Sequence, residues 1–418
     1  MSTPDPRAGC GHDAPAQPVA QALQRILDAV TPVCQTEQLS LKQALHRVLA
    51  APVVSGVDVP AHTNSAMDGY ALRAQDLAAP GALRLVGESF AGRPFADRVE
   101  AGQCVRIMTG AVLPAGADSV IMQERAERRG ADVHFSVAAR PGENVRAAGE
   151  DYARGQPVLA PGRRLAAADL GVLASVGVDR VAVYRRPRVA FFSTGDELRG
   201  VGQPLAPGEI YDSNRYSLHG MLAELGVEIE DLGVIRDEPA ALRAALQQAS
   251  HGHDAVLSSG GVSVGEADYM LDILAECGEV DFWQVAIKPG RPLAFGRVGS
   301  ALYFGLPGNP VSVMVTFLQL VRPALVRLSG GTPAPALQLQ LPLRAPVRHS
   351  PGRCEYQRAR LIHDEHGTGV MPLGHQGSGV LRSMAEADCF IVLDEPRKQI
   401  PAGSPVCVEP FVQPVWQR

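Results

Sequence analysis

Lysine is nearly absent from this sequence of 418 residues, in which Lys42, Lys288 and Lys398 are the only lysines among 39 basic residues. No lysine follows a glycine, so the G-K-[ST] end of a Walker phosphate loop is excluded. Basic residues form no run, and the formal net charge is only −5. Because proteins that bind nucleic acid usually carry a basic run or patch, the composition gives no reason to expect that partner.

A paired-cysteine motif, a signal peptide and a long apolar run are also missing. The seven cysteines include no C-x-x-C pair, which argues against a zinc or iron–sulfur site and for reduced thiols in a cytoplasmic protein. Residues 1–17 are polar and are expected to be a disordered tail. The longest apolar stretch, about 311–321, is shorter than the roughly 20 residues that span a membrane. We therefore expect no membrane contact.

Strands alternate with helices between about 186 and 329, and this order predicts a doubly wound, mostly parallel sheet. The stretches 188–197, 255–277 and 301–310 each begin with an apolar strand that ends in a polar or glycine-containing turn. Ligands of such sheets bind beyond the carboxyl ends of the strands. The loops that follow the strands should therefore converge on one site.

Helical spacing accompanies these strands. It predicts helices near 218–225 and 242–249, from Met270, and from Val311, where Asn309 would be the N-cap and Pro310 the first helical residue. Outside this region, helices are predicted over 19–30, over 41–49 with Ser40 as its cap, and over 166–176.

The predicted fold is α/β and multidomain. Its parts are a tail (1–17); an N-terminal region (18–185) in which helical or linker parts (18–51 and 141–185) flank an inserted β-rich domain (52–140); the α/β domain (186–329); and a C-terminal β-barrel or sandwich domain (330–418).

Carboxylates and basic residues occur together in the loops after the predicted strands. Glu197, Asp237 and Asp268 share this edge with Lys288 and Arg291. Structural ion pairs would explain any single carboxylate as well as function does, and an acid at a helix start can simply be a cap. Acids beside a glycine-rich turn would nevertheless repel a phosphate unless a divalent cation such as Mg²⁺ lay between them. A carboxylate could also accept N–H bonds from a heterocycle such as a pterin. The residues alone favour metal-assisted transfer or hydrolysis on an anionic substrate.

Nine motifs in a fixed order connect the chain with a known family. They are SAMDGYA, RIMTGA, GED, FSTGDEL, YDSN, IRDEP, SSGGVSVGEADY, IKPGRP and GLPGNPVS, and the resemblance that they carry extends from about residue 20 to the C-terminus. The ordered set resembles the MoeA family of molybdopterin molybdenumtransferases, which is related to the C-terminal part of gephyrin. The resemblance implies a cytoplasmic homodimer of four-domain subunits with clefts shared between subunits. It also implies that molybdate is inserted into adenylylated molybdopterin with Mg²⁺-dependent release of AMP, and that the partners are the molybdopterin adenylyltransferase and downstream molybdenum cofactor carriers.

The resemblance assigns roles by motif. The catalytic candidates are Asp68, Thr109, Asp151, Glu197, Asp237 and Asp268, of which Glu197, Asp237 and Asp268 are also the metal candidates. The candidates for substrate binding are Ser193, Thr194, Gly195, Ser258, Ser259, Gly260, Gly261, Lys288, Arg291, Pro307, Gly308, Asn309 and Pro310. In the K-P-G-K turn of the family, Arg291 replaces the second lysine. Arginine can bind an oxyanion through two N–H groups where lysine acts as a point charge, so the geometry there is expected to differ.

Two other functions remain open at this stage. Stand-alone molybdopterin adenylyltransferases share the SSGG and PGNP signatures, but they lack the SAMDGYA half and the C-terminal β domain. Gephyrin's related portion also anchors receptors, so the chain could be an interaction scaffold. A scaffold would not need the cleft acids, and this sequence keeps them all.

Overall fold

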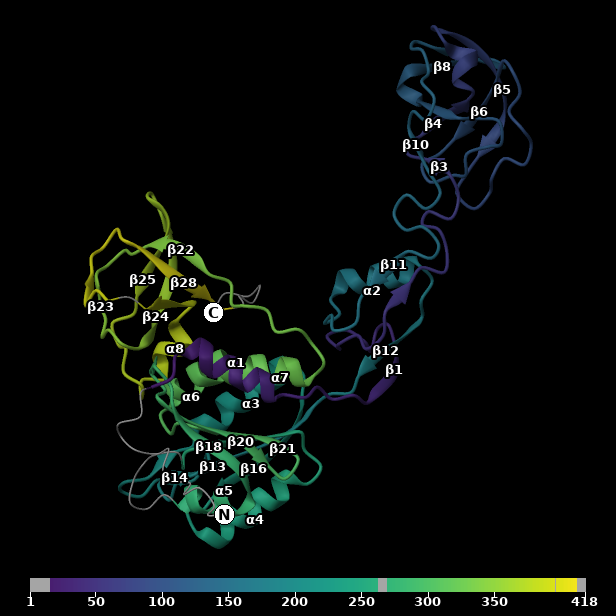
Figure 1. Cartoon of the computed structure of the whole chain (residues 1–418). Coiled ribbons are helices and arrows are strands. Elements are labelled where there is room, and N and C mark those ends of the chain that lie inside the picture. Colours follow the sequence, from purple (N-terminus) through teal and green to yellow (C-terminus); the bar gives the residue numbers. More distant parts are fainter. Residues whose placement is uncertain (1–15, 262–268, 395, 412–418) are drawn as a thin grey trace. The chain divides into compact units, whose positions relative to one another are not determined.

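The computed structural model of the chain describes residues 16–261, 269–394 and 396–411. These residues form two compact units, of which unit 2 is 38–183 and unit 1 contains the described residues before and after it (Figure 1). The chain enters and leaves unit 2 through the paired strands β1 (Thr36–Ser40) and β12 (Arg180–Tyr184). Of the predicted tail, 1–15 lies outside the described residues, whereas Gln17 pairs with Val285.

Unit 1 is built on a six-stranded sheet in the spatial order β16-β13-β17-β21-β20-β18. The strands are β13 (Arg188–Thr194), β16 (Glu228–Ile235), β17 (Ala255–Ser259), β18 (Gly278–Gln284), β20 (Pro292–Val298) and β21 (Ala301–Leu306). Strands β16, β13, β17 and β21 are parallel, and β20 is antiparallel to both β21 and β18. The predicted doubly wound, mostly parallel sheet is confirmed, with antiparallel pairing on one side.

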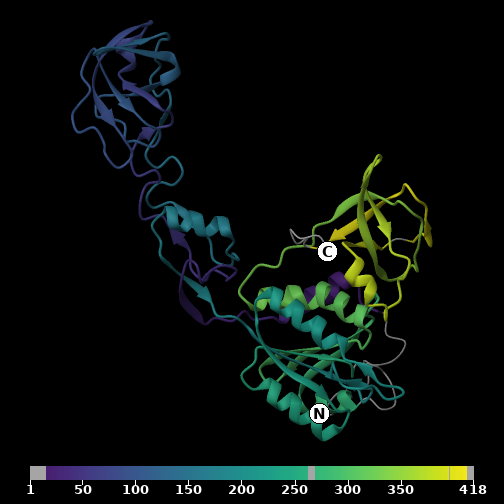
Figure 2. The same cartoon turned by 180° about the vertical axis from the view of Figure 1, so that it is seen from behind.

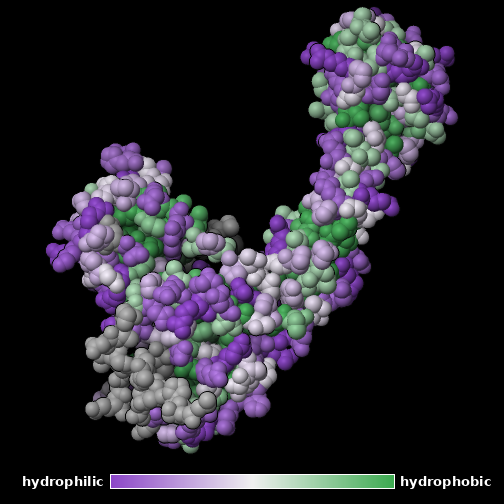
Figure 3. Space-filling model, viewed as in Figure 1, coloured by the Kyte–Doolittle hydropathy of each residue, from purple (hydrophilic) through white to green (hydrophobic). Residues whose placement is uncertain are grey.

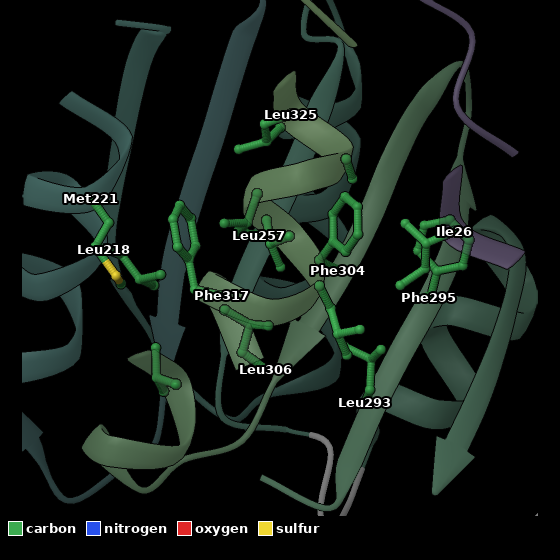
Figure 4. Packing of buried hydrophobic residues seen from close by; sticks show 14 of the residues in the cluster. Ile26, Leu218, Met221, Leu257, Leu293, Phe295, Phe304, Leu306, Phe317 and Leu325 are labelled. Carbon is green, nitrogen blue, oxygen red and sulfur yellow. The ribbon is translucent and has the colours of Figure 1, made fainter. Parts of the chain in front are cut away.

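Helices cover both faces of this sheet, as the two opposite views show (Figures 1 and 2). One face carries α1 (Val19–Ala29), α3 (Ser213–Leu225), α6 (Pro310–Thr316) and α7 (Arg322–Leu328), and the other carries α4 (Pro239–Ser250) and α5 (Tyr269–Cys277). The core on the first face contains Leu257, Phe304 and Phe317 (Figure 4). Because a parallel sheet is buried on both faces, its central strands are almost wholly apolar until they reach their carboxyl ends.

The helical run from Pro310 to Leu328 packs into this core. It joins α6, the π-helical turn η4 (Phe317–Val321) and α7, and Asn309 and Pro310 occupy the predicted N-cap and first helical positions. The Asn309 side chain makes no capping hydrogen bond. The run has 19 residues and extends beyond the apolar stretch 311–321, and by length and composition alone it could cross a membrane. Most of it is buried in unit 1, as expected of a core helix.

A second six-stranded sheet in unit 1 is formed mainly by the part of the chain after α7. Its order is β19-β24-β26-β28-β22, with β25 beside β24. The strands are β19 (Ile287–Lys288), β22 (Leu339–Pro342), β24 (Cys354–Asp364), β25 (Gly367–Pro372), β26 (Cys389–Leu393) and β28 (Pro405–Pro410); β23 (Val347–Arg348) pairs separately with β27 (Gln399–Ile400), and a short helix α8 is Arg382–Glu386. Strand β19 comes from the α/β part of the chain and pairs in parallel with β24.

Unit 2 contains a third six-stranded sheet in the order β7-β4-β6-β5-β9-β8. The strands are β4 (Gly69–Leu72), β5 (Gly81–Ser89), β6 (Gln103–Ile107), β7 (Ser119–Met122), β8 (Ala126–Arg129) and β9 (Asp132–Phe135), with 3₁₀ turns η2 (Ala74–Leu77) and η3 (Gln123–Arg125). Two small ladders accompany it: β3 (Asn64–Ser65) with β10 (Val145–Arg146), and β2 (Val53–Val54) with β11 (Pro157–Leu159). The predicted helix near 166–176 is α2 (Ala167–Ser175).

The predicted helix over 41–49 was wrong. The segment makes one helical turn, in which Ala44 N–H donates to the Ser40 carbonyl, and then turns at His46, whose φ is +64°. From there the backbone forms hydrogen bonds with a distant part of unit 2, and the His46 N–H donates to the Leu165 carbonyl. Ala44 and Leu49 are buried in a small core with Leu165. Tertiary pairing therefore overrides a helical pattern that is only nine residues long.

Several large apolar side chains are exposed in the segment 201–216 of unit 1. Val201, Ile210 and Tyr216 are 62%, 54% and 54% exposed. The segment includes the two-residue parallel pair of β14 (Leu198–Arg199) and β15 (Ile210–Tyr211). On the face shown in Figure 3, hydrophilic and hydrophobic residues are interspersed over both units.

Candidate functional site

Polar side chains replace apolar ones where β13 and β17 end. Ser193 pairs in register with Ser259, and Ser259 pairs with Leu306 of β21. Side chains alternate between the faces of a strand. Ser193 therefore lies on the same face as Phe191, which packs in the α3/α6 core, and Ser259 lies on the same face as Leu257. Both serines are buried and face the side of the sheet that α3 and α6 cover.

Ser258 points to the opposite face. Its hydroxyl lies 2.6 Å from the hydroxyl of Tyr303, which belongs to the core under α4 and α5. The structure thus separates the two adjacent serines that the motif suggested as binding residues. Ser259 belongs to the α3/α6 side of the carboxyl edge, and Ser258 belongs to a buried hydrogen bond.

Asn214 joins two loops of this edge and was not among the predicted site residues. Its side-chain amide donates to Ser259 Oγ at 2.8 Å and to the Gly308 carbonyl at 2.7 Å. The position follows from the start of α3, where Asp212 is the N-cap and accepts the Arg215 N–H at 3.1 Å. The YDSN motif contained this signal, because an Asp before a helix commonly caps it and fixes the side chains of the first turn.

The turn after β17 requires glycine. Gly260 has φ +93° and Gly261 has φ +67°. A Cβ on Gly260 would lie 2.5 Å from the Thr194 carbonyl oxygen. The Gly260 N–H donates to the Leu306 carbonyl at 3.1 Å, so this amide is not free to bind an anion. In the neighbouring loop Pro307 is buried, whereas Gly308 and Asn309 are exposed.

Acidic side chains gather after β13 and β16. Thr194 Oγ1 lies 3.5 Å from Asp237 Oδ1, and the Asp237 N–H lies 3.5 Å from Asp196 Oδ1, both at the long limit of a hydrogen bond. A Cβ on Gly195 would lie 2.7 Å from a Glu197 carboxylate oxygen, so Glu197 folds back over this turn. Burial and then the Asp196 charge, with a smaller effect of Glu197, raise the pKa of Asp237 above its ordinary value.

Oxygen ligands of this kind suit Mg²⁺, which proteins usually bind through one or two carboxylates together with substrate phosphates. Across 16–261, 269–394 and 396–411, no group of three or more His, Cys, Asp or Glu side chains is placed so that it could hold a metal ion. Asp268 lies outside the described residues, directly before α5. Burial raises the pKa of Asp237 most, and the charge of Asp196 adds to this effect; a divalent cation would relieve the repulsion between these carboxylates.

The turn containing Lys288 and Arg291 reaches the same edge. Strand β18 ends there and β20 begins there, because β20 runs antiparallel to its neighbours. A Cβ on Gly290 would lie 2.5 Å from Thr316 Oγ1, so the turn packs closely against α6. Arg291 is exposed, and its guanidinium makes no hydrogen bond or ion pair with the described residues.

Lys288 forms an ion pair within the protein. Its ammonium lies 3.1 Å from Glu355 Oε1, and the two residues are cross-strand partners of β19 and β24. Glu355 is buried and also accepts from Gln357 Nε2 at 3.1 Å. These donors lower the pKa of Glu355 despite the opposing effect of its burial. The lysine thus depends on the C-terminal sheet for its position, which the sequence did not reveal.

The remaining predicted residues lie in unit 2. Asp68 Oδ1 accepts the Thr109 backbone N–H and the Thr109 hydroxyl, each at 2.7 Å. These two bonds lower the pKa of Asp68, the backbone one most. Asp151 lies in an exposed bend, where its N–H donates to the Val59 carbonyl at 2.9 Å. The structure therefore brings Asp68 and Thr109 together and records no contact of either with Asp151 within the described part of unit 2.

Three consecutive stretches of the chain match known family profiles. Residues 17–177 match the MoeA N-terminal region (domain I and II), 190–327 match a probable molybdopterin binding domain, and 340–411 match the MoeA C-terminal region (domain IV).

Individual proteins are similar along nearly the whole chain. A molybdopterin molybdenumtransferase of Haemophilus influenzae is 42% identical over 94% of this chain and 98% of its own length. Gephyrin of Dictyostelium discoideum is 32% identical over 93% of this chain and 61% of its own length. The solved structure of a molybdopterin biosynthesis MoeA protein from Pyrococcus horikoshii OT3 has a TM-score of 0.82 at 28% identity, covering 95% of this chain and all of that one.

Replacement of Gly260 should show how tightly the turn after β17 is packed. Gly260→Ala places a Cβ against the Thr194 carbonyl in a backbone conformation that alanine disfavours. We expect it to lower the free energy of unfolding by about 1–3 kcal/mol. Gly308→Ala is the matched control, because its Cβ would meet nothing within 4 Å, and it should cost less than about 0.5 kcal/mol. Urea unfolding measures both, and equal losses would contradict the close approach.

The acidic loops should make stability depend on pH. Because the folded-state pKa of Asp237 is raised, its contribution to stability is present below the unfolded value of about 3.9 and is lost as pH rises through the folded pKa. Asp237→Asn removes that loss. The variant should gain stability relative to the wild type from acid to neutral pH, by less than about 1 kcal/mol because water screens a half-buried carboxylate.

Urea unfolding of both proteins across this pH range measures the effect. Addition of Mg²⁺ at neutral pH should then stabilise the wild type more than the variant, because a bound cation favours the ionised carboxylate. If wild type and Asp237→Asn differed in stability by the same amount at every pH, the folded protein would not raise the pKa of Asp237.

Proposed function

Because the chain belongs to the MoeA family of molybdopterin molybdenumtransferases, we propose that it inserts molybdate into adenylylated molybdopterin and releases AMP in a Mg²⁺-dependent step of molybdenum cofactor synthesis. Family membership confirms the resemblance that the ordered motifs indicated. The observation that supports the activity best is the gathering of acidic loops, a strained glycine turn and the Gly308 loop at the carboxyl edge of one parallel sheet.

Acidic and basic residues of the edge would have different roles. Glu197 and Asp237 would hold the cation, with Asp268, which precedes α5 in the sequence, as a further carboxylate. Bound Mg²⁺ would neutralise the charge of the substrate phosphate. Arg291, whose guanidinium is exposed and free of described partners, would bind an oxyanion through paired N–H groups. Lys288 would add a second positive charge, in the position that Glu355 gives it.

The competing activity is adenylylation of molybdopterin by ATP. The matches to the MoeA N-terminal and C-terminal regions favour the molybdenum insertion step, because the two regions lie outside the α/β domain that the adenylyltransferases share. A pure scaffold is disfavoured by the strain at Gly260 and by the raised pKa of Asp237, since a surface used only for docking needs neither.

An assay of AMP release from adenylylated molybdopterin tests the proposal. Release should require both molybdate and Mg²⁺ and should stop when EDTA is added. Asp237→Asn should stay folded and release AMP at least about tenfold more slowly, with partial recovery at high Mg²⁺. Exposed Asp281→Asn, on β18, is a control with the same change of charge. Release without molybdate, or ATP-dependent adenylylation instead, would contradict the proposal.

We also propose that the protein is a homodimer in the cytoplasm, with each cleft shared between subunits. By resemblance to the family, Asp68 and Thr109 would contribute to the cleft of the partner subunit. Both residues lie in unit 2, whereas the acidic loops lie in unit 1. The exposed apolar segment containing Val201 and Ile210 also favours a subunit contact, because such residues on a soluble protein commonly mark an interface. Association with the adenylyltransferase and with cofactor carriers would follow from the proposed place in synthesis.

Subunit mixing tests the shared cleft. Asp68→Ala and Asp268→Ala dimers should each be inactive, and their heterodimers should carry one intact cleft. Random exchange would restore roughly a quarter of wild-type activity, since half of the dimers are mixed and each has one working cleft. Each variant exchanged with itself is the control. Absence of recovery after subunit exchange has been verified by mass spectrometry would contradict the shared cleft.

A further inference from the structure

We propose that His349 is a positioning residue of the candidate site, because it holds the carboxylate of Glu355 in the orientation that places the ammonium of Lys288. The inference rests on the proposed function, in which Lys288 supplies a positive charge for the substrate. It deepens that function in one respect. No predicted site residue lies beyond Pro310 in the sequence, and His349 would give the C-terminal β sheet a part in the reaction.

His349 is a buried histidine that the proposed reaction does not otherwise use. Its side chain is fully buried, and its Nδ1 lies 3.3 Å from Glu355 Oε2. Burial raises the pKa of Glu355, but hydrogen bonds from Lys288, Gln357 and His349 outweigh this effect and the pKa is lowered. The carboxylate is therefore ionised at neutral pH and can only accept hydrogen bonds. His349 is then the donor of this contact, with a proton on Nδ1.

Both oxygens of the Glu355 carboxylate have donors. Oε1 faces Lys288 Nζ and Gln357 Nε2, each at 3.1 Å. Oε2 faces His349 Nδ1 and the backbone N–H of Ser350, whose nitrogen is 3.4 Å away. The last torsion of a glutamate side chain is soft, so donors on one oxygen alone would let the carboxylate rotate. Donors on both oxygens fix its plane and thereby the direction in which Oε1 points.

The backbone around His349 is anchored as well. Its N–H donates to the Lys398 carbonyl at 2.9 Å, beside the ladder of β23 and β27. Gln357 Nε2 also donates to the Arg348 carbonyl at 2.6 Å, so β24 is tied back to β23. A continuous path of hydrogen bonds therefore leads from this ladder through Glu355 to the candidate site.

A lysine gains from such support because its charge lies at the end of a flexible four-carbon chain. The side chain of Lys288 is 36% exposed, so part of it faces solvent. An ammonium has three donors, and Glu355 Oε1 accepts from one of them. Held in this way, Lys288 can still donate to an oxyanion of the substrate, and it does so from a fixed position.

A purely structural ion pair is the alternative explanation. Glu355 and His349 would then only join β19 to β24, and the exact position of the Lys288 ammonium would not matter. Breaking a buried ion pair destabilises a protein whether or not the pair has a function. The test must therefore follow the ammonium itself as well as stability.

Two substitutions of His349 differ by one methylene and place an amide nitrogen differently. In His349→Asn the nitrogen is as many bonds from the backbone as Nδ1, so it can still donate to Glu355 Oε2. In His349→Gln it takes the place of Nε2, and the donor to Glu355 is lost. We expect both variants to fold, whereas only His349→Gln should release Lys288. His363→Asn is the matched control, because His363 is an exposed histidine of β24, the strand that carries Glu355.

NMR of the lysine side chains follows the ammonium directly. The chain has only the lysines Lys42, Lys288 and Lys398, and Lys42 and Lys398 are exposed. Reductive methylation with ¹³C-formaldehyde keeps their positive charge, and Lys288→Arg identifies the signal of Lys288. This signal should differ from the two exposed ones in the wild type and in His349→Asn, and should move toward them in His349→Gln. The same signal position in both His349 variants would overturn the proposal.

Binding of AMP shows whether the position of Lys288 matters to a ligand. Titration calorimetry should give an affinity about three- to tenfold lower for His349→Gln than for the wild type, as expected for a weakened charge-assisted contact. His349→Asn and His363→Asn should stay within about twofold. Unchanged affinity in His349→Gln would make the contact structural and overturn the proposal. If the wild type itself does not bind AMP, the proposed function fails, and the lysine signal still decides the role of His349.

Discussion

In-register pairing of three parallel strands is the constraint on which this site depends. Because β13, β17 and β21 run in one direction, their last residues come to the same edge, and the period of two along each strand decides which side chains share a face. Ser193 and Ser259 therefore face α3 together, whereas Ser258 is turned into the opposite core. A shift of one residue in either strand would exchange these roles.

Much of the α/β domain could be predicted from the sequence, because its signals are local. The apolar strands end in polar turns, and the Asn309-Pro310 pair marks the start of α6 as expected. The positive φ angles of Gly260 and Gly261 explain why the SSGG motif contains two glycines in a row. These features need only the neighbouring residues, so a pattern of a few residues is enough to identify them.

Features that depend on distant segments could not be predicted in the same way. The stretch 41–49 has helical spacing, but its backbone pairs with residues more than a hundred positions away. Lys288 was placed in a loop, yet it lies on β19 and binds Glu355 of a strand that belongs to the C-terminal sheet. Asn214 was overlooked because its importance comes from two loops that follow other strands. Each error has the same cause, namely a partner that no local pattern identifies.

The charges at the edge explain why an anionic substrate would need help to bind there. Burial and then the charge of Asp196, with a smaller effect of Glu197, raise the pKa of Asp237 on one side of this edge. Lys288 faces the carboxylate of Glu355, and an ammonium paired in this way attracts a second anion less than a free one does. Arg291 alone would not offset three carboxylates. A phosphate would therefore approach a negatively charged edge. A divalent cation shared between the carboxylates and the phosphate is the simplest way to turn this repulsion into attraction. The acidic residues and the proposed requirement for Mg²⁺ would thus be two aspects of one electrostatic arrangement.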